Sequence, residues 1–129
     1  MPFLNDLKAQ LLNDREVFPW ITLEDLVYDC PLTGEIYTVP KYFRTDGASI
    51  PKALIALPIV GQALAIRYFG QGVWQGFKQG VLHDWLRRGK RTPVSASIAH
   101  QIFREALMER DYPADLVENY YNAVVLFNS

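Results

Sequence analysis

The spacing of apolar residues changes once along this chain, and that change limits the folds open to it. Between residues 17 and 45, β-branched and aromatic residues stand in short runs broken by Pro19, Pro31, Gly34 and Pro40. Beyond residue 76, apolar residues recur at roughly the 3.6-residue period of a helix face. Short strands followed by a block of helices are typical of an α+β domain. The sequence therefore predicts a small N-terminal antiparallel β-meander packed against a C-terminal bundle of about three helices.

The expected elements follow from these local patterns. Runs of β-branched and aromatic residues predict strands near 18–22, 25–29, 35–39 and 41–44. The stretch DCPLTGEI, with its proline and glycine, predicts the hairpin turn between the second and third of these. Helical spacing predicts a short amphipathic helix over residues 3–13, and further helices over 51–56, 59–69, 76–88, 94–110 and about 113–127.

Length and charge narrow the class of protein. A chain of 129 residues suits a single domain spanning residues 1–129. Its formal net charge of −1 and pI near 6.1 argue against a dedicated nucleic-acid binder, which would carry a basic stripe. The run RRGKR, residues 87–91, is interpreted as a solvated helix end. The single cysteine, Cys30, has no disulfide partner within the chain, so we expect a small buried thiol.

The most apolar stretch is residues 53–74, and it is interrupted by Pro58, Gly61 and Arg67. Its uninterrupted part is shorter than the roughly 20 residues of a membrane-spanning helix, so no transmembrane segment is expected. The stretch is interpreted as core plus loop, or as an apolar patch that faces a partner. No secretory signal is recognisable, which makes the cytoplasm, or a particle assembled there, the expected location.

Adjacent His83 and Asp84 lie inside a predicted helix that needs neither of them. On a helical wheel His83 falls opposite the apolar face, in line with Gly76 and Gly80. Glycines one turn apart let another backbone approach closely, so we expect His83 to point into a contact with another segment. Asp84 points in a different direction and is expected to bond a neighbouring loop.

Two other segments supply candidate partners. Asp46 stands in a strand-to-helix turn beside Gly47, and His100 lies on the shoulder of the apolar face of the next helix. Two histidines and one carboxylate are acceptable ligands for zinc or another divalent metal, so Asp46, His83 and His100 are the candidate metal ligands. His83 and Asp84 are the candidate catalytic pair, with Asp84 orienting a histidine or acting as a base. The same residues could instead form a hydrogen-bonded network that only fixes the fold.

The order FRTDGASIP, VLHDWL, IFREAL and YNAVV resembles domain-of-unknown-function family 1353, found in phages and prophages, over roughly residues 35–127. The specific parts of the match are residues 45–51 and 82–85. In the family an Ala-Asp pair usually stands where this chain has Ala99 and His100, so a carboxylate is replaced by an imidazole. The resemblance implies a phage origin, often among tail and late structural genes, and implies no established reaction.

Three functions are consistent with these features. The first is a virion protein, a tail or tail-associated structural or assembly component, which binds other phage structural proteins through residues 53–74. The second is a metal-dependent hydrolase acting on cell envelope or phosphoester bonds. The third is a small inhibitor or adaptor of a host protein that uses the 53–74 patch. The expected location is the host cytoplasm during assembly, and the virion.

Overall fold

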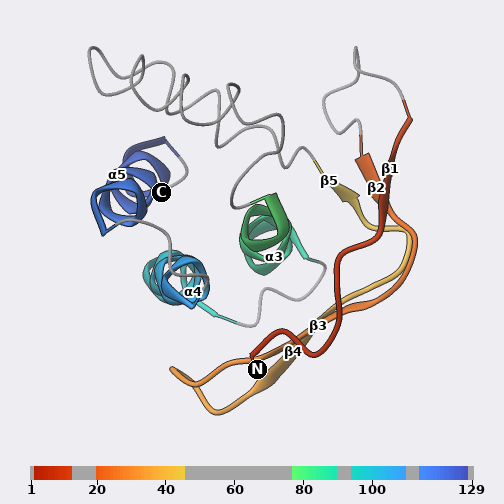
Figure 1. Ribbon diagram of the computed structural model, residues 1–129, viewed down its shortest axis with the longest axis horizontal. Helices are drawn as coiled ribbons and strands as arrows, with labels where there is room; N and C mark the ends of the chain where they lie inside the picture. Colours follow the sequence, from red (N-terminus) through yellow and green to blue (C-terminus); the bar gives the residue numbers. More distant parts are fainter. Residues whose placement is uncertain (1, 13–19, 46–76, 90–93, 110–113, 128–129) are drawn as a thin grey trace.

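The structure, a computed structural model, describes residues 2–12, 20–45, 77–89, 94–109 and 114–127. Asp46, the apolar stretch 53–74 and the helices expected over 51–56 and 59–69 lie outside the described residues. The described part is an α+β fold, as predicted, with antiparallel strands on one side and helices on the other (Figure 1). Its strands are β1 (Ala9–Leu11), β2 (Trp20–Thr22), β3 (Leu26–Asp29), β4 (Ile36–Val39) and β5 (Arg44–Thr45). Its helices are α3 (Phe77–Arg88), α4 (Ala96–Met108) and α5 (Ala114–Phe127).

The strands form two small sheets, one with the order β1-β2-β5 and one made by the β3–β4 hairpin. In the hairpin Leu26 pairs with Val39 and Tyr28 with Tyr37. The turn between them is the predicted one, and Gly34 takes a φ of 74°, a conformation that glycine adopts without steric cost. Cys30, at the start of this turn, is a buried free thiol, as predicted.

The prediction of an N-terminal helix is wrong. Phe3 forms an antiparallel bridge with Tyr28, and residues 9–11 form β1. Side chains from Phe3 to Gln10 alternate between half-buried and exposed, the two-residue period of an extended chain. The spacing of the leucines fits a helix as well, but backbone hydrogen bonds to the hairpin edge decide the outcome, since the Leu4 N–H donates to the Val27 carbonyl at 2.9 Å.

The three helices match the predicted segments to within a few residues. Helix α4 lies between α3 and α5 and packs against both (Figure 1). Ser95 caps α4, with its hydroxyl accepting from the Ile98 N–H at 3.3 Å. The hairpin and two helices share one core. The buried members of this core are Leu26, Tyr28, Cys30, Tyr37 and Val39 from the hairpin region, Val81, Leu82 and Leu86 from α3, and Ala99, Ile102 and Ala106 from α4.

A four-residue turn, Pro40 to Phe43, joins the two sheets where strand 41–44 was expected. Phe43 N–H donates to the Pro40 carbonyl at 3.3 Å, and Tyr42 has a φ of 68°. Positive φ at the third residue is typical of a type II turn, which normally takes glycine or asparagine there. Buried Thr22 holds the turn, because its hydroxyl donates to the Pro40 carbonyl at 2.8 Å and accepts from the Phe43 N–H at 2.9 Å.

No described helix is both long and apolar enough to pass through a membrane.

Candidate functional site

Helices α3 and α4 bring His83 and His100 together in the interior of the protein. His83 Nε2 lies 2.9 Å from His100 Nδ1, and each residue is only 4% exposed. The predicted contact of His83 with another segment is therefore present, and the segment is α4. Phe103, one turn after His100, covers His83 with ring centroids 5.4 Å apart. The pair thus lies in a mostly apolar environment between two helices.

The two imidazoles lie edge to edge. Their centroids are 5.1 Å apart and their planes differ by 26°. The distance between the two nitrogens, added to the distance from each nitrogen to the centre of its own ring, is close to the distance between the ring centroids. The two nitrogens therefore lie on the line that joins the rings and face each other. Two lone pairs at 2.9 Å repel, so the nitrogens must share a proton or a cation.

Burial keeps both rings neutral near pH 7. Desolvation, with smaller contributions from His100 and Arg87, lowers the pKa of His83 to about 3. Desolvation and then Arg87 lower the pKa of His100 as well. One neutral ring must donate to the other. If His83 donates, His100 carries its own proton on Nε2; if His100 donates, its Nε2 has an open lone pair. In either case His100 Nε2 is buried and has no hydrogen-bond partner within the described structure.

Asp84 contacts a different part of the fold. Its Oδ2 accepts from the Thr45 hydroxyl at 2.7 Å, and Arg88 donates to Oδ1 at 2.5 Å and to Oδ2 at 2.6 Å. Arg88 also donates to the Arg44 carbonyl at 2.9 Å. Asp84 therefore joins α3 to strand β5, whereas the sequence predicted a bond to a neighbouring loop. Within the part of the chain that the structure describes, no hydrogen bond links Asp84 to either histidine.

Of the three candidate metal ligands, the structure brings two together. His83 and His100 face each other, whereas Asp46 lies outside the described residues, directly after Thr45. In the described ranges no group of three His, Cys, Asp or Glu side chains is arranged to hold a metal ion. The pair alone offers two nitrogen ligands, and a metal site would need further ligands.

Several contributors to this region were not predicted from the sequence. Thr45 and Arg88 complete the Asp84 contacts, and Thr22 fixes the turn that leads to β5. Asp84 and Arg88 are four residues apart on a helix, so their ion pair could have been predicted from spacing. Nothing in the local sequence marks Thr22 or Thr45, because their partners are distant in the chain.

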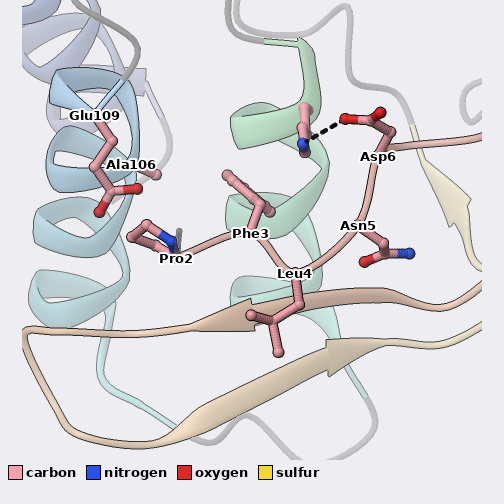
Figure 2. Close-up of a pocket in the computed structure, with 8 residues that line it drawn as sticks. Pro2, Phe3, Leu4, Asn5, Asp6, Ala106 and Glu109 are labelled. Carbon is pink, nitrogen blue, oxygen red and sulfur yellow. Dashed lines mark hydrogen bonds and ion pairs between the residues drawn. The ribbon is translucent and has the colours of Figure 1, made fainter.

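The described residues also line surface pockets away from the histidine pair. One, of about 410 Å³, lies between the N-terminal residues Pro2 to Asp6 and Lys78 of α3, Ala106 of α4 and Glu109, which caps the end of α4 (Figure 2). Lys78 bridges it, with its ammonium 3.4 Å from Asp6 and 4.5 Å from the Phe3 ring centroid. Desolvation raises the pKa of Glu109, which accepts from the Tyr28 hydroxyl at 3.1 Å. A second pocket, of about 630 Å³, lies at the end of α3. Neither pocket is lined by His83 or His100.

Comparison with known proteins places this arrangement in a family. No curated protein and no solved structure matches the chain. A family model described as "Protein of unknown function (DUF1353)" matches residues 20–124. The matched region runs from β2 into α5 and contains both histidines, Asp84 and Thr45. Because the match covers most of the 129 residues, the chain belongs to the DUF1353 family.

Proposed function

We propose that this protein is a small bacteriophage virion component, a tail or tail-associated structural or assembly protein, in which the Asp and His residues hold the fold. The observation that carries the proposal is the burial of the histidine pair: both rings are 4% exposed and bond each other at 2.9 Å. A group that must act on a cell-envelope polymer has to be reachable by that polymer. These rings are covered by helices instead.

The contacts of Asp84 support the same conclusion. Both of its oxygens accept hydrogen bonds from Arg88, and one also accepts from Thr45. All three bonds run to groups of the fold itself, so they hold the carboxylate in place. Its position fixes α3 against β5.

The phage setting comes from the resemblance of the TDGASIP and LHDW segments to phage and prophage proteins. An assembly protein must also present surface to its neighbours, and the hairpin does so. Leu32, in the turn of the β3–β4 hairpin, is 45% exposed, and Ile36, the first residue of β4, is 60% exposed. Exposed apolar side chains at the end of a hairpin are available to a partner. In this proposal the partners are other phage structural proteins, and residues 53–74 are the second candidate contact.

Particle composition tests the proposal. The tagged chain would be produced in a host together with the late genes that neighbour its own gene, and particles would be purified on a density gradient. We expect mass spectrometry to find the chain in the particles at a constant ratio to the tail proteins. Ile36→Ser should lower that ratio, whereas Lys8→Gln, which removes only an exposed ion pair, should leave it unchanged. Complete particles that lack the chain would disprove the proposal.

A metal-dependent hydrolase is the second candidate, and the facing histidine nitrogens favour it. Two nitrogens bound to one metal ion at about 2.0–2.1 Å lie about 2.9 Å apart in octahedral and about 3.3 Å apart in tetrahedral geometry, near the 2.9 Å observed between His83 and His100. Asp46 is the third candidate ligand, and the substrate would be a cell-envelope or phosphoester bond.

Elemental analysis separates the two candidates. Protein purified without chelator should carry about one zinc or other divalent ion per chain if the second candidate holds, and His83→Gln should lose it. If the histidines only hold the fold, metal is present in traces and chelator leaves the melting temperature unchanged.

A further inference from the structure

Strand β4 lies at an open edge of its sheet. The other side of the hairpin is joined by the N-terminal residues: the Leu4 N–H donates to the Val27 carbonyl at 2.9 Å, and the Asp29 N–H donates to the Pro2 carbonyl at 2.6 Å (Figure 2). Among the described strands, β4 pairs with β3 alone. The hairpin therefore has one edge covered by the chain itself and, within the described residues, one edge that is not.

The pairing register shows which backbone groups face this edge. The Cys30 N–H donates to the Glu35 carbonyl at 2.9 Å, so the backbone of Glu35 faces β3. Successive residues of an antiparallel strand face opposite sides, so the backbone of Tyr37 faces β3 as well, whereas the N–H and C=O groups of Ile36 and Thr38 face away. No hydrogen bond from the described residues reaches these outward groups. Both residues are exposed, Ile36 by 60%.

Nothing in β4 protects this edge against a further strand. Exposed edges are usually guarded by a lysine, a proline, an inward-pointing charge or a bulge. The strand Ile36–Val39 has the sequence IYTV, which contains no charge and no proline and consists of residues that favour strands. It pairs with β3 one residue to one residue, so it has no bulge. The edge is therefore able to accept another strand.

This edge is complementary to a second copy of itself. When two β4 strands pair antiparallel about a two-fold axis at Tyr37, Ile36 of each copy lies opposite Thr38 of the other. Every outward N–H and C=O group of the two strands then has a partner across the axis. The exposed β-branched side chains of Ile36 and Thr38 also become cross-strand neighbours, which is a favourable pairing.

The charges that flank the strand favour the same arrangement. Glu35 directly precedes β4, Lys41 follows it closely, and both are exposed. The Lys41 ammonium lies 4.8 Å from the centroid of the neutral Tyr42 ring, and within the described residues neither charge forms an ion pair. Antiparallel copies bring the acidic end of each strand towards the basic end of the other, whereas parallel copies would place like charges together.

We propose that β4 pairs antiparallel with β4 of a second copy of this chain, so that the two hairpins form one continuous sheet across a two-fold axis. The paired strands are short, and the dimer therefore dissociates on dilution. The inference does not depend on the proposed tail function, which uses exposed side chains of the hairpin rather than its backbone. An extended segment of another protein would use the same edge, and the tests distinguish it from a second copy.

Molar mass as a function of concentration tests the pairing. Light scattering on the full chain between about 1 µM and about 500 µM should show the mass rising from 14.8 kDa towards twice that value. Thr38→Pro removes an outward N–H without removing a bond to β3, so it should stay monomeric throughout. Thr38→Ser keeps the N–H and should dimerise like the native chain. A native chain that stays monomeric over this range, including one that binds an extended peptide instead, would overturn the proposal.

Disulfide trapping provides a test that does not need the proline variant to fold. Ile36→Cys and Thr38→Cys are purified separately and mixed under a mild oxidant. In the proposed dimer positions 36 and 38 of different copies face each other with Cα atoms about 5.5 Å apart, within the range for a disulfide, so the mixed pair should cross-link about 10-fold faster than either variant alone. The native chain, which keeps buried Cys30, is the control and should not cross-link. Equal rates in the mixture and in the separate variants would contradict the pairing.

Discussion

At the scale of single residues, the buried pair of His83 and His100 makes stability depend on pH. Burial holds the folded-state pKa of His83 at about 3, below the ordinary value of 6.5, and lowers that of His100 in the same direction. Well above pH 6.5 the two histidines are neutral in the folded and in the unfolded chain, so they do not make the free energy of unfolding depend on pH. Below it the unfolded chain binds protons that the folded chain does not, so stability falls as the pH falls towards 3.

We therefore expect the free energy of unfolding to fall between about pH 7 and about pH 5, by up to about 1.4 kcal/mol per pH unit for each histidine. Urea titrations at several pH values in metal-free buffer measure this slope. The double variant His83→Leu with His100→Leu should flatten it. An equally steep slope in that variant would assign the pH dependence to other groups.

The same pair predicts a non-additive mutational effect. Changing His83 alone to Leu leaves His100 Nδ1 buried without its partner, at a cost of about 1–3 kcal/mol. Changing both residues removes both polar groups, so the double variant should be less destabilised than the sum of the single variants. Thermal or urea unfolding of the four proteins gives the coupling energy. Additive effects would show that the two nitrogens do not share a proton.

Residue-level chemistry was only partly visible in the sequence. A contact of His83 with another segment was predicted from the sequence and is present, and Asp84 was expected to bond a nearby loop. The contact between His83 and His100 could not be derived, because it depends on how α3 and α4 pack. Tyr42 could not be recognised either, since its positive φ is imposed by hydrogen bonds from Thr22, twenty residues earlier in the chain.

At the scale of elements, the contact between Thr45 and Asp84 holds β5 against α3. The two side chains bond at 2.7 Å, and the Asp84 side chain is 13% exposed. Thr45→Val removes the hydroxyl with little change in volume and should lower the free energy of unfolding by about 1 kcal/mol. Chemical denaturation measures the difference.

Lys8→Gln is the control for this change. It removes the ion pair between Lys8 and Glu24, whose side chains are 62% and 52% exposed. Exposed pairs contribute little, so the change should be below about 0.5 kcal/mol. Equal effects of the two variants would contradict the structural role assigned to Asp84.

Helices were predicted better than the N-terminal segment, and the reason is physical. Each of α3, α4 and α5 buries one face, and this produces a 3.6-residue period of apolar residues that can be recognised within the helix sequence itself. Residues 3–13 carry leucines at helical spacing, yet residues 3–11 lie against β3 and β2 as extended chain. The backbone hydrogen bonds offered by the edges of β3 and β2 outweighed the local preference for a helix that the leucine spacing suggested.

At the scale of the whole molecule, the shared core predicts cooperative unfolding. Residues of the hairpin and of α3 and α4 belong to one buried cluster. Leu86→Ala should lower the free energy of unfolding by about 2–5 kcal/mol. The helices and the strands of the variant should still unfold in a single transition. Far-ultraviolet circular dichroism and tryptophan fluorescence should give the same midpoint. Two distinct midpoints would show that the strands and helices unfold independently.

The shared core cannot be complete until the ribosome has made the helices, because the strands come earlier in the chain. The hairpin emerges before the helices, and its inward side chains Leu26, Tyr28 and Val39 share a core with α3 and α4, which follow it by about forty residues or more. A nascent hairpin therefore lacks the helical part of its core while the next segments are translated. We expect chaperones to bind the inward face of the hairpin during synthesis and to be released when α3 and α4 pack against it.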